Sequence, residues 1–368
     1  MNNSKINVLI FHPYSRIGGA DLSISKLINN LSHKKYKIEF ICLNSQKIKK
    51  YLQKNIKIHI VKSSKTIFSI FKVRKIIKNN FKKDYKKIIF FSNQNYANIL
   101  SYFITYNLSN SLKTVVIERN HISELFIYFG IKDFFKKLVI KSMMKITYNK
   151  FDWIIGNSKE LSKDLGEYLN LKTHTIYNSV FNHRYKKNKT IKNKRTILNV
   201  GRLEKQKDQV TLIKAIYLVN KQLDVDLIIV GNGSQYKKLI QLIYFFNLKK
   251  RIKIITNTSK LGPFYKKSNL FVLSSLYEGF PNVITESISM NLPVISSDCK
   301  SGPKEILMNS QGPDFFKKGD YKNLSKKILN YYRNPSILNK KCYRVKKSLN
   351  RFAIKNLVNK YDNLFTNL

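Results

Sequence analysis

The feature that most constrains the fold of this chain is the alternation of short apolar runs with longer amphipathic stretches. The apolar runs are almost continuously hydrophobic, as expected of parallel strands that are buried on both faces. The first series of predicted strands comprises Ile6–Phe11, Ile38–Leu43, Ile56–Val61, Lys87–Phe91, Thr114–Ile117 and Trp153–Ile155. Amphipathic stretches such as Ala20–Leu31 and Ile67–Asn79 lie between these runs and predict helices. This alternation favours a βαβ architecture with a parallel sheet.

The alternation stops once and then starts again. Residues 182–195 are polar, basic and without periodicity, which predicts a linker. The strands predicted after it are Ile197–Val200, Leu227–Val230, Ile252–Ile255, Leu270–Leu273 and Val294–Ser296. The helices predicted after it are Asp208–Val219, Gln235–Phe246 and Asn282–Met290. The fold class is therefore α/β, with two Rossmann-like, doubly wound domains that face each other across a cleft.

A length of 368 residues agrees with two domains, each able to bury a core of its own. We expect a first domain at residues 1–181, the linker at 182–195 and a second domain at 196–345. The remaining residues, 346–368, are expected to form a helix that packs back on the first domain.

Neither a membrane span nor a secretion signal is expected from the sequence. There is no run of 18 apolar residues, and Met1–Ile10 predicts a first strand instead of a signal peptide. Cys42, Cys299 and Cys342 lie far apart, which suits a reducing compartment and offers no metal-binding spacing.

The net charge of +48 admits two interpretations. A nucleic acid or an anionic membrane surface would be attracted by such a field. Alternatively, codon bias explains most of the charge, because Lys, Asn and Ile are abundant together.

Two clusters in the second half carry the clearest chemical signal. Gly201, Arg202 and Lys207 follow the first strand of the second domain, and two fixed cations there suit a diphosphate. Glu278 and Glu286 lie in one short segment of a chain that has 21 acidic and 69 basic residues. The first of these glutamates follows a buried strand, and the second lies about one turn into a predicted helix.

Two clusters in the first half follow strands as well. Arg16–Asp21 contains Gly18 and Gly19, where paired glycines and a helix N-terminus allow close approach of an anion. A tight strand-to-helix turn would need glycine in any case. In Glu118–His121, the histidine is either a ligand contact at a strand end or a side chain satisfied by its own neighbours.

Two further patterns predict little. The Asp224 and Asp226 pair has the form of a metal site, but it leads into a buried strand, so no metal is expected there. Gly231–Gly233 is interpreted as a turn near the cleft, because it lacks a full dinucleotide-binding fingerprint.

Taken together, these motifs resemble the retaining glycosyltransferases of the two-Rossmann (GT-B) fold, family 4. The resemblance extends over most of the chain and is densest over residues 197–307. Ser275–Glu286 is similar to the family's signature of two glutamates separated by seven residues, which is highly specific. Asp298–Leu307 looks like members that build bacterial surface polysaccharides or lipid-linked oligosaccharides. Asp21 stands where Glu is usual, and Asn309–Phe316 departs from the family's glycine-led strand.

The resemblance implies a role for each matching residue. Arg202 and Lys207 would neutralise the leaving diphosphate, Glu278 would hold the donor sugar, and Glu286 would bind the ribose hydroxyls. His121 would contact the donor sugar from the first domain, on the acceptor side. The remaining residues expected to bind the donor are Gly18, Gly19, Gly279, Phe280 and Asn282.

The function implied is transfer of a hexose or N-acetylhexosamine from a nucleotide-sugar, expected to be a UDP-sugar, with retention at the anomeric carbon. The acceptor would be lipid-linked or a surface polysaccharide, and neither a cofactor nor a metal is expected. The alternatives are another sugar-nucleotide enzyme of the same fold, an epimerase or a phosphorylase, and a basic nucleic-acid-binding protein. The polysaccharide-like motif opposes the first alternative, and the glutamate pair opposes the second.

The chain is also expected to attach to the cytoplasmic membrane from its inner face. Leu125–Lys150 mixes aromatic and aliphatic residues with many lysines, as does Lys65–Lys87. A basic amphipathic helix of this kind can lie among lipid headgroups. Lys136, Lys137 and Lys141 are expected to contact the lipid phosphates. The alternative is that both helices simply cover the sheet and that codon bias supplies their lysines.

Overall fold

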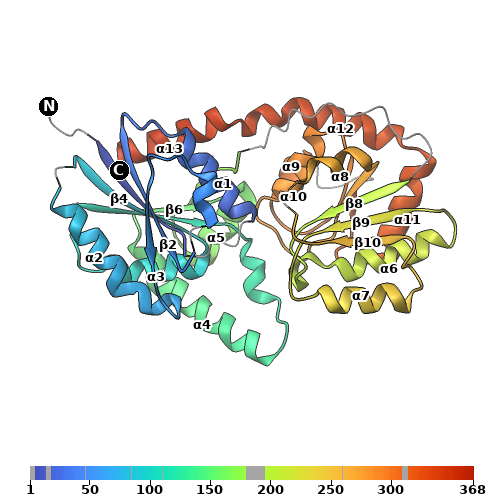
Figure 1. The fold of residues 1–368 in the computed structure, drawn as a ribbon, viewed down its shortest axis with the longest axis horizontal. Helices are drawn as coiled ribbons and strands as arrows, with labels where there is room; N and C mark the ends of the chain where they lie inside the picture. Colours follow the sequence, from blue (N-terminus) through green and yellow to red (C-terminus); the bar gives the residue numbers. More distant parts are fainter. Residues whose placement is uncertain are drawn as a thin grey trace. The chain divides into compact units, whose positions relative to one another are not determined.

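The computed structural model describes residues 5–13, 18–45, 47–83, 85–109, 111–179, 195–258, 260–308 and 314–368. The chain divides into two compact units, one of residues 1–179 with 352–368 and one of residues 180–351 (Figure 1). Residues 182–194 of the expected linker, together with Arg16, lie outside the described residues. The second unit ends at Arg351, later than the boundary expected at residue 345.

The first unit contains a parallel sheet in the order β3-β2-β1-β4-β5-β6-β7. Its strands are β1 (Ile6–Phe11), β2 (Tyr36–Leu43), β3 (Lys57–Val61), β4 (Lys87–Asn93), β5 (Leu112–Glu118), β6 (Trp153–Gly156) and β7 (His174–Thr175). The strand order changes direction between β1 and β4, which pair in parallel with Ile6 opposite Lys87. Ligands of doubly wound sheets bind beyond the carboxyl ends of the strands at such a change of direction.

Helices cover both faces of this sheet. Val8 and Ile10 of β1 pack with α1 (Gly19–Asn30) and α13 (Ile354–Asn367). Leu9 and Phe11 point to the opposite face, as the pleat requires, and pack with the two helices that follow β3 and β4. The helices on that second face are α2 (Ile70–Phe81), α3 (Asn95–Thr105) and α4 (Ile131–Thr147).

Short helices and one further α-helix complete the first unit. They are η1 (Lys47–Tyr51), η2 (Thr66–Ser69), η3 (Ile122–Phe126), η4 (Tyr148–Lys150) and α5 (Lys159–Leu169). At the carboxyl end of the chain, α13 packs against α1 through residues such as Leu364 and Phe365, so these last residues belong to the core of the first unit.

The second unit contains a parallel sheet in the order β10-β9-β8-β11-β12-β13. Its strands are β8 (Thr196–Val200), β9 (Asp226–Val230), β10 (Ile252–Ile255), β11 (Leu270–Leu273), β12 (Val294–Ser297) and β13 (Phe315–Phe316). Here the order changes direction between β8 and β11, which pair in parallel. The two parallel, doubly wound sheets confirm the fold class predicted from the sequence.

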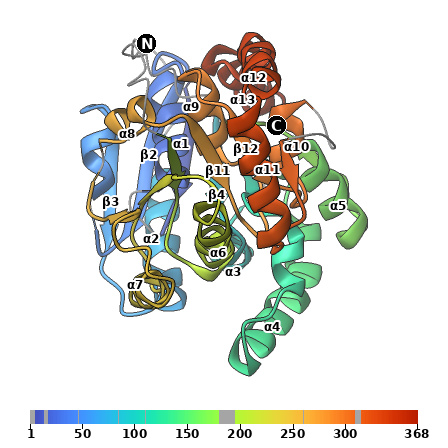
Figure 2. The same ribbon diagram turned by 90° about the vertical axis from the view of Figure 1, so that its right-hand side faces the viewer.

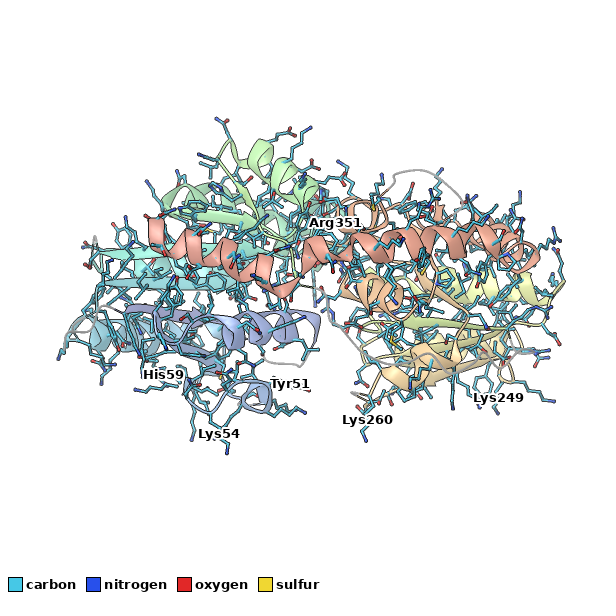
Figure 3. All side chains as sticks on the ribbon, turned by 90° about the horizontal axis from the view of Figure 1, so that it is seen from above. Tyr51, Lys54, His59, Lys249, Lys260 and Arg351 are labelled. Carbon is cyan, nitrogen blue, oxygen red and sulfur yellow. The ribbon has the colours of Figure 1, made fainter. Side chains whose placement is uncertain are left out.

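The helices of the second unit also form two layers. One layer comprises α6 (Gln209–Asn220), α7 (Tyr236–Phe245) and α11 (Tyr321–Arg333). The other side carries α8 (Gly262–Lys267), α9 (Asn282–Ser289), α10 (Gly302–Leu307) and α12 (Ser336–Ser348), and the single-turn elements are η5 (Lys205–Lys207) and η6 (Leu349–Phe352). Arg351 donates to the carbonyls of Glu305 and Ile306 and so fixes the end of α12 and η6 against α10 (Figure 3).

The helix α4 is the longest helix of the first unit, and it projects from the layer of helices in two perpendicular views (Figures 1 and 2). In the part of the chain that the structure describes, no helix combines the length and apolarity needed to cross a bilayer.

Candidate functional site

The carboxyl ends of β8 and β11 bring the main candidate residues of the second unit together. These strands are neighbours at the point where the order of the sheet changes direction. Arg202 and Lys207 follow β8, and Ser275 and Glu278 follow β11. The topology thus joins two motifs that lie about seventy residues apart in the sequence.

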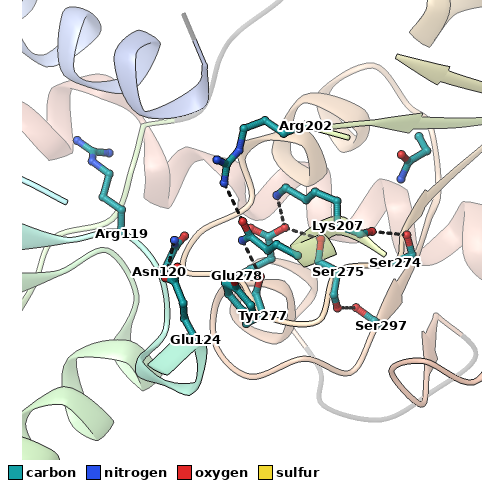
Figure 4. Close-up of polar contacts among 12 residues, drawn as sticks. Arg119, Asn120, Glu124, Arg202, Lys207, Ser274, Ser275, Tyr277, Glu278 and Ser297 are labelled. Carbon is teal, nitrogen blue, oxygen red and sulfur yellow. Dashed lines mark hydrogen bonds and ion pairs between the residues drawn. The ribbon is translucent and has the colours of Figure 1, made fainter. Parts of the chain in front are cut away.

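Lys207 and Glu278 form an ion pair at this place (Figure 4). The Nζ atom of Lys207 lies 2.5 Å from Oε1 of Glu278, and the same oxygen accepts a hydrogen bond of 2.6 Å from Oγ of Ser275. The Lys207 carbonyl accepts a hydrogen bond of 2.7 Å from Ser274. Both side chains of the ion pair are largely buried. Removing either one would leave a charge without its partner in a poorly solvated place.

Arg202 is held by its own loop. Its Nη2 donates to Oε1 of Gln206 at 2.8 Å, and Nε2 of Gln206 donates to the carbonyl of Tyr277 at 3.0 Å. Gln206 therefore ties the loop after β8 to the loop that carries Glu278. Arg202 as a residue is exposed to solvent, so it is accessible to an anionic ligand.

The loop of Gly279 is fixed by the segment that starts α10. Gly302 donates from its backbone N–H to the carbonyl of Gly279 at 2.7 Å, and Ser301 donates to the same oxygen from its hydroxyl at 3.0 Å. A Cβ at position 302 would lie only 2.3 Å from that carbonyl oxygen, so this position requires glycine. Part of the Asp298–Leu307 motif therefore acts by positioning the Glu278 loop.

Glu286 lies in α9 and is braced by a tyrosine from α8. The hydroxyl of Tyr265 donates to Oε2 of Glu286 at 2.9 Å, and both side chains are buried. Burial, followed by the charge of Glu286, raises the pKa of Tyr265 well above its usual value, so the phenol remains a donor. Asn282, the first residue of the same helix, and Phe280, in the loop before it, are buried as well.

The Gly231–Gly233 turn packs against the turn of Gly201. The backbone N–H of Gly201 donates to the Val230 carbonyl, and a Cβ at Gly231 would lie 1.9 Å from the Gly201 carbonyl oxygen. The glycine thus serves close packing of two strand ends, as expected of a turn at this edge.

In the first unit, Asp21 holds the turn that precedes α1. Its Oδ2 accepts a hydrogen bond of 2.8 Å from the N–H of Gly18, and Oδ1 lies 3.0 Å from Nε2 of His12. The other ring nitrogen of His12 lies 3.0 Å from Oδ1 of Asn93. Asp21 thus ties Gly18, at the start of α1, to a buried network of His12 and Asn93 at the ends of β1 and β4.

Arg119 extends this network at the end of β5. Its Nε donates to Oδ1 of Asn93 and its Nη1 donates to Oδ1 of Asn178, both at 3.2 Å. Ser23 of α1 donates to the same Asn178 oxygen at 3.1 Å. The carboxyl ends of β1, β4 and β5 thus share one set of polar contacts.

His121 is engaged at both ring nitrogens. Nδ1 accepts from the N–H of Ser123 at 3.1 Å, and Nε2 lies 3.0 Å from Oδ2 of Asp164 in α5. Since Nδ1 accepts, the ring proton belongs on Nε2, where it faces the carboxylate. His121 therefore has hydrogen-bonding partners within its own unit, which is one of the two interpretations that the sequence allowed. Its contact with a donor sugar stays a prediction.

Glu118 points into the core of the first unit. Tyr148 and Asn98 both donate to its Oε1. Burial raises the pKa of this carboxyl to about 7, although the two hydrogen bonds oppose the shift. A carboxyl group held in this way is not presented to a ligand as a nucleophile.

Asp224 and Asp226 both pair with Arg251. The pair that has the form of a metal site in the sequence therefore has a structural role. Within the described ranges, no group of three or more His, Cys, Asp or Glu side chains is placed to hold a metal ion. Independence from metal stays a prediction that activity measurements must test.

The sequence did not single out several residues of these networks. They are His12, Asn93, Asn178, Gln206 and Tyr265. A polar residue directly after a buried strand was the available signal for His12, at the end of β1, and Asn93 is the last residue of β4. Tyr265 had no such signal, because its partner lies on a different helix.

Comparison with known proteins finds a family whose sequence model matches part of the chain. The sequence model of the family Glycosyl transferases group 1 matches residues 181–348. A glycosyltransferase of Methanocaldococcus jannaschii is 37% identical over 172 residues, which are 46% of this chain and 39% of that protein. The chain therefore spans less than half the length of this relative.

A second relative matches over most of both chains. The N-acetylgalactosamine-N,N'-diacetylbacillosaminyl-diphospho-undecaprenol 4-alpha-N-acetylgalactosaminyltransferase of Campylobacter jejuni is 28% identical over 320 residues, 82% of this chain and 83% of that protein. Among solved structures, Anabaena HepE in complex with UDP and glucose has a TM-score of 0.79 and 17% identity, covering 98% of this chain and all of that one. At this identity the similarity establishes the fold.

Proposed function

We propose that the chain is a glycosyltransferase of the group 1 family and that it moves a hexose or N-acetylhexosamine from a nucleotide-sugar to a lipid-linked or polysaccharide acceptor. We propose further that the donor is a UDP-sugar, that transfer retains the anomeric configuration and that no metal or cofactor is needed. The observation that carries the proposal is the Lys207–Glu278 ion pair at the strand switch of the second unit.

The donor would bind at this switch point. Arg202 is exposed and held by Gln206, so it is suited to a phosphate oxygen, and Lys207 places a second cation nearby. Glu278 would accept hydrogen bonds from the sugar, and Glu286 from the ribose. Gly279, Phe280 and Asn282 would form the wall of the site around them.

The names of the similar proteins support the donor and acceptor classes. Anabaena HepE is seen with UDP and glucose, and the Campylobacter relative is named for a diphospho-undecaprenol acceptor. A further relative, the amylovoran biosynthesis glycosyltransferase of Erwinia amylovora, is named for a polysaccharide. We therefore place this chain in the assembly of a surface polysaccharide or a lipid-linked oligosaccharide, at the inner face of the cytoplasmic membrane.

The mechanism that fits these residues relies on stabilising charge. As the bond from the sugar to the diphosphate breaks, Arg202 and Lys207 would neutralise the departing phosphate. Glu118 and Asp21, two carboxylates near the strand ends of the first unit, are both engaged by their own networks. A front-face path without a covalent intermediate therefore agrees better with the described residues than attack by a carboxylate.

The test is a screen of UDP-, GDP- and dTDP-sugars with the full chain. Protection against thermal unfolding and slow hydrolysis of the donor in the absence of acceptor are the two readouts. We expect a UDP-sugar to give both effects and expect Lys207→Ala to reduce both. A chain that responds to none of the nucleotides, or that converts a nucleotide-sugar into its epimer, would contradict the proposal.

A further inference from the structure

The outer face of α4 is an apolar stripe on the surface of the first unit. Ile131, Phe134, Phe135, Leu138, Val139 and Ile146 recur at the spacing of one helix face, and all of them are exposed. Ile131 is 78% exposed. The opposite face, with Ile140 and Met144, packs into the core of the unit. A helix that covers a sheet needs only one apolar face, so the second one calls for another occupant.

Lysines flank the stripe on both sides. At 100° per residue, Lys132 and Lys136 lie along one edge of the stripe, and Lys141 and Lys145 lie along the other. Lys141 and Lys145 rest over aromatic rings of Phe126, Tyr128 and Tyr168. The long aliphatic stems of such lysines let the ammonium groups reach a plane of phosphates while the rings between them enter an apolar layer.

The one acidic residue of α4 does not disturb this arrangement. Asp133 lies toward the buried side and pairs with Lys137, whose Nζ lies 2.7 Å from the carboxylate and 2.5 Å from the Ile127 carbonyl. Lys137 is 6% exposed. The expectation that Lys137 contacts lipid was therefore wrong, because this lysine shares the inward face of the helix with Ile140 and Met144.

The neighbouring helices extend the same character. Next to α4 in the layer, α3 exposes Phe103 and Tyr106, and beyond it α2 exposes Phe71, which is 82% accessible. Between residues 60 and 109 the sequence contains one acidic residue, Asp84. The layer of α2, α3 and α4 thus combines exposed aromatic rings with many basic and few acidic residues.

We propose that this surface, centred on the α4 stripe, inserts into the headgroup region of an anionic lipid bilayer. The complementarity of the lysines to lipid phosphate and of the aromatic stripe to acyl chains selects this occupant. This proposal rests on the proposed function, because a lipid-linked acceptor would lie in such a bilayer.

Insertion is tested by fluorescence with the full chain. Phe135→Trp places an indole in the stripe, whereas Phe245→Trp places one at an even more exposed position of α7 in the second unit. The native Trp153 provides the background in the wild type. We expect brominated acyl chains in phosphatidylglycerol vesicles to quench the indole at position 135 and to leave the indole at 245 unchanged. Equal quenching at both positions, or quenching at neither, would overturn the proposal.

Co-sedimentation then separates the contributions of charge and of apolar side chains. The triple variant Phe135→Ser, Leu138→Ser, Val139→Ser should bind phosphatidylglycerol vesicles at least tenfold more weakly, and so should Lys132→Gln, Lys136→Gln, Lys145→Gln. Phe245→Ser is the matched control and should bind as the wild type does. Little of the wild type or of any variant should sediment with vesicles of phosphatidylcholine alone.

Two further readouts keep the outcome specific. The stripe variants should retain the wild-type melting temperature and bind free nucleotide as the wild type does, because the stripe contains none of the residues proposed to bind the donor. A wild type that does not bind nucleotide would count against the proposed function and not against the proposal that the α4 stripe binds a membrane. If the stripe variants change the oligomeric state in sedimentation and do not change vesicle binding, a second copy of the chain covers the stripe. That result would overturn the membrane proposal.

Discussion

Lys207 and Glu278 form an ion pair, with Nζ 2.5 Å from Oε1. The cation comes from the loop after β8 and the carboxylate from the loop after β11, and Ser275 shares the same carboxylate oxygen. One side chain is proposed to face the diphosphate and the other the sugar. Their mutual contact fixes both positions, and charges held in fixed positions lower a barrier when charge develops in the transition state.

The first prediction concerns the two cations. Arg202→Ala and Lys207→Ala should each slow turnover by roughly 100-fold or more, because each removes a fixed charge from the departing phosphate. Lys205→Ala is the matched control, since Lys205 is an exposed lysine of the same loop. Steady-state rates with a defined donor decide the matter, and wild-type turnover in both alanine variants would remove these residues from the mechanism.

The second prediction separates the two glutamates. Glu286→Gln should weaken the binding of free nucleotide, because it removes a charged acceptor for the ribose hydroxyls and changes the group that Tyr265 supports. Glu278→Gln should mainly lower turnover, because its proposed partner is the sugar. Calorimetric titration with the bare nucleotide measures the difference. An equal loss of affinity in both variants would refute this division.

The third prediction concerns the buried carboxyl of Glu118. Its pKa is raised from 4.5 to about 7, mainly by burial. The folded chain therefore holds this proton more tightly than the unfolded chain does. The resulting stability is present in full below about pH 4.5 and is lost as the pH rises through about 7, a difference of about 3 kcal/mol.

Glu118→Gln should remove this dependence, because the amide stays neutral at every pH. Chemical denaturation of the variant and the wild type across this range gives the difference in the free energy of unfolding. The free energy of unfolding of the variant should rise relative to that of the wild type as the pH rises from 5 to 8. A difference that stays constant over the range would show that Glu118 titrates normally.

The fourth prediction is independence from metal. Asp224 and Asp226 face Arg251, and Arg202 with Lys207 can supply the positive charge that a divalent ion supplies elsewhere. Transfer should survive EDTA at the untreated rate. Loss of activity with EDTA and rescue by Mn²⁺ or Mg²⁺ would contradict this prediction.

The sequence predicted the buried strands closely, because a strand covered on both faces must be apolar along its whole length. β1, β10 and β11 agree with the prediction at both ends. β7 and β13 were missed, because two residues are too short to show a periodic pattern. The expected strand-to-helix turns that carry Gly18, Arg202 and Glu278 also lie where the alternation placed them.

The partners of the candidate residues were not predictable in the same way. The sequence singled out Glu278 and Lys207 separately and assigned them to different parts of a donor, whereas the structure joins them. Such a contact depends on the order of strands in the sheet, which the apolar pattern does not specify. The inward orientation of Lys137 could have been predicted, because it shares a helix face with Ile140 and Met144.

The anomeric configuration of the product is the decisive measurement of retaining sugar transfer at the site of Lys207 and Glu278. Proton NMR of a reaction with an α-linked UDP-sugar and a lipid-linked acceptor should show an α-linked glycoside, formed by the wild type and largely absent with Lys207→Ala. A β-linked product, or a nucleotide-sugar that changes configuration without transfer to the acceptor, would contradict the account.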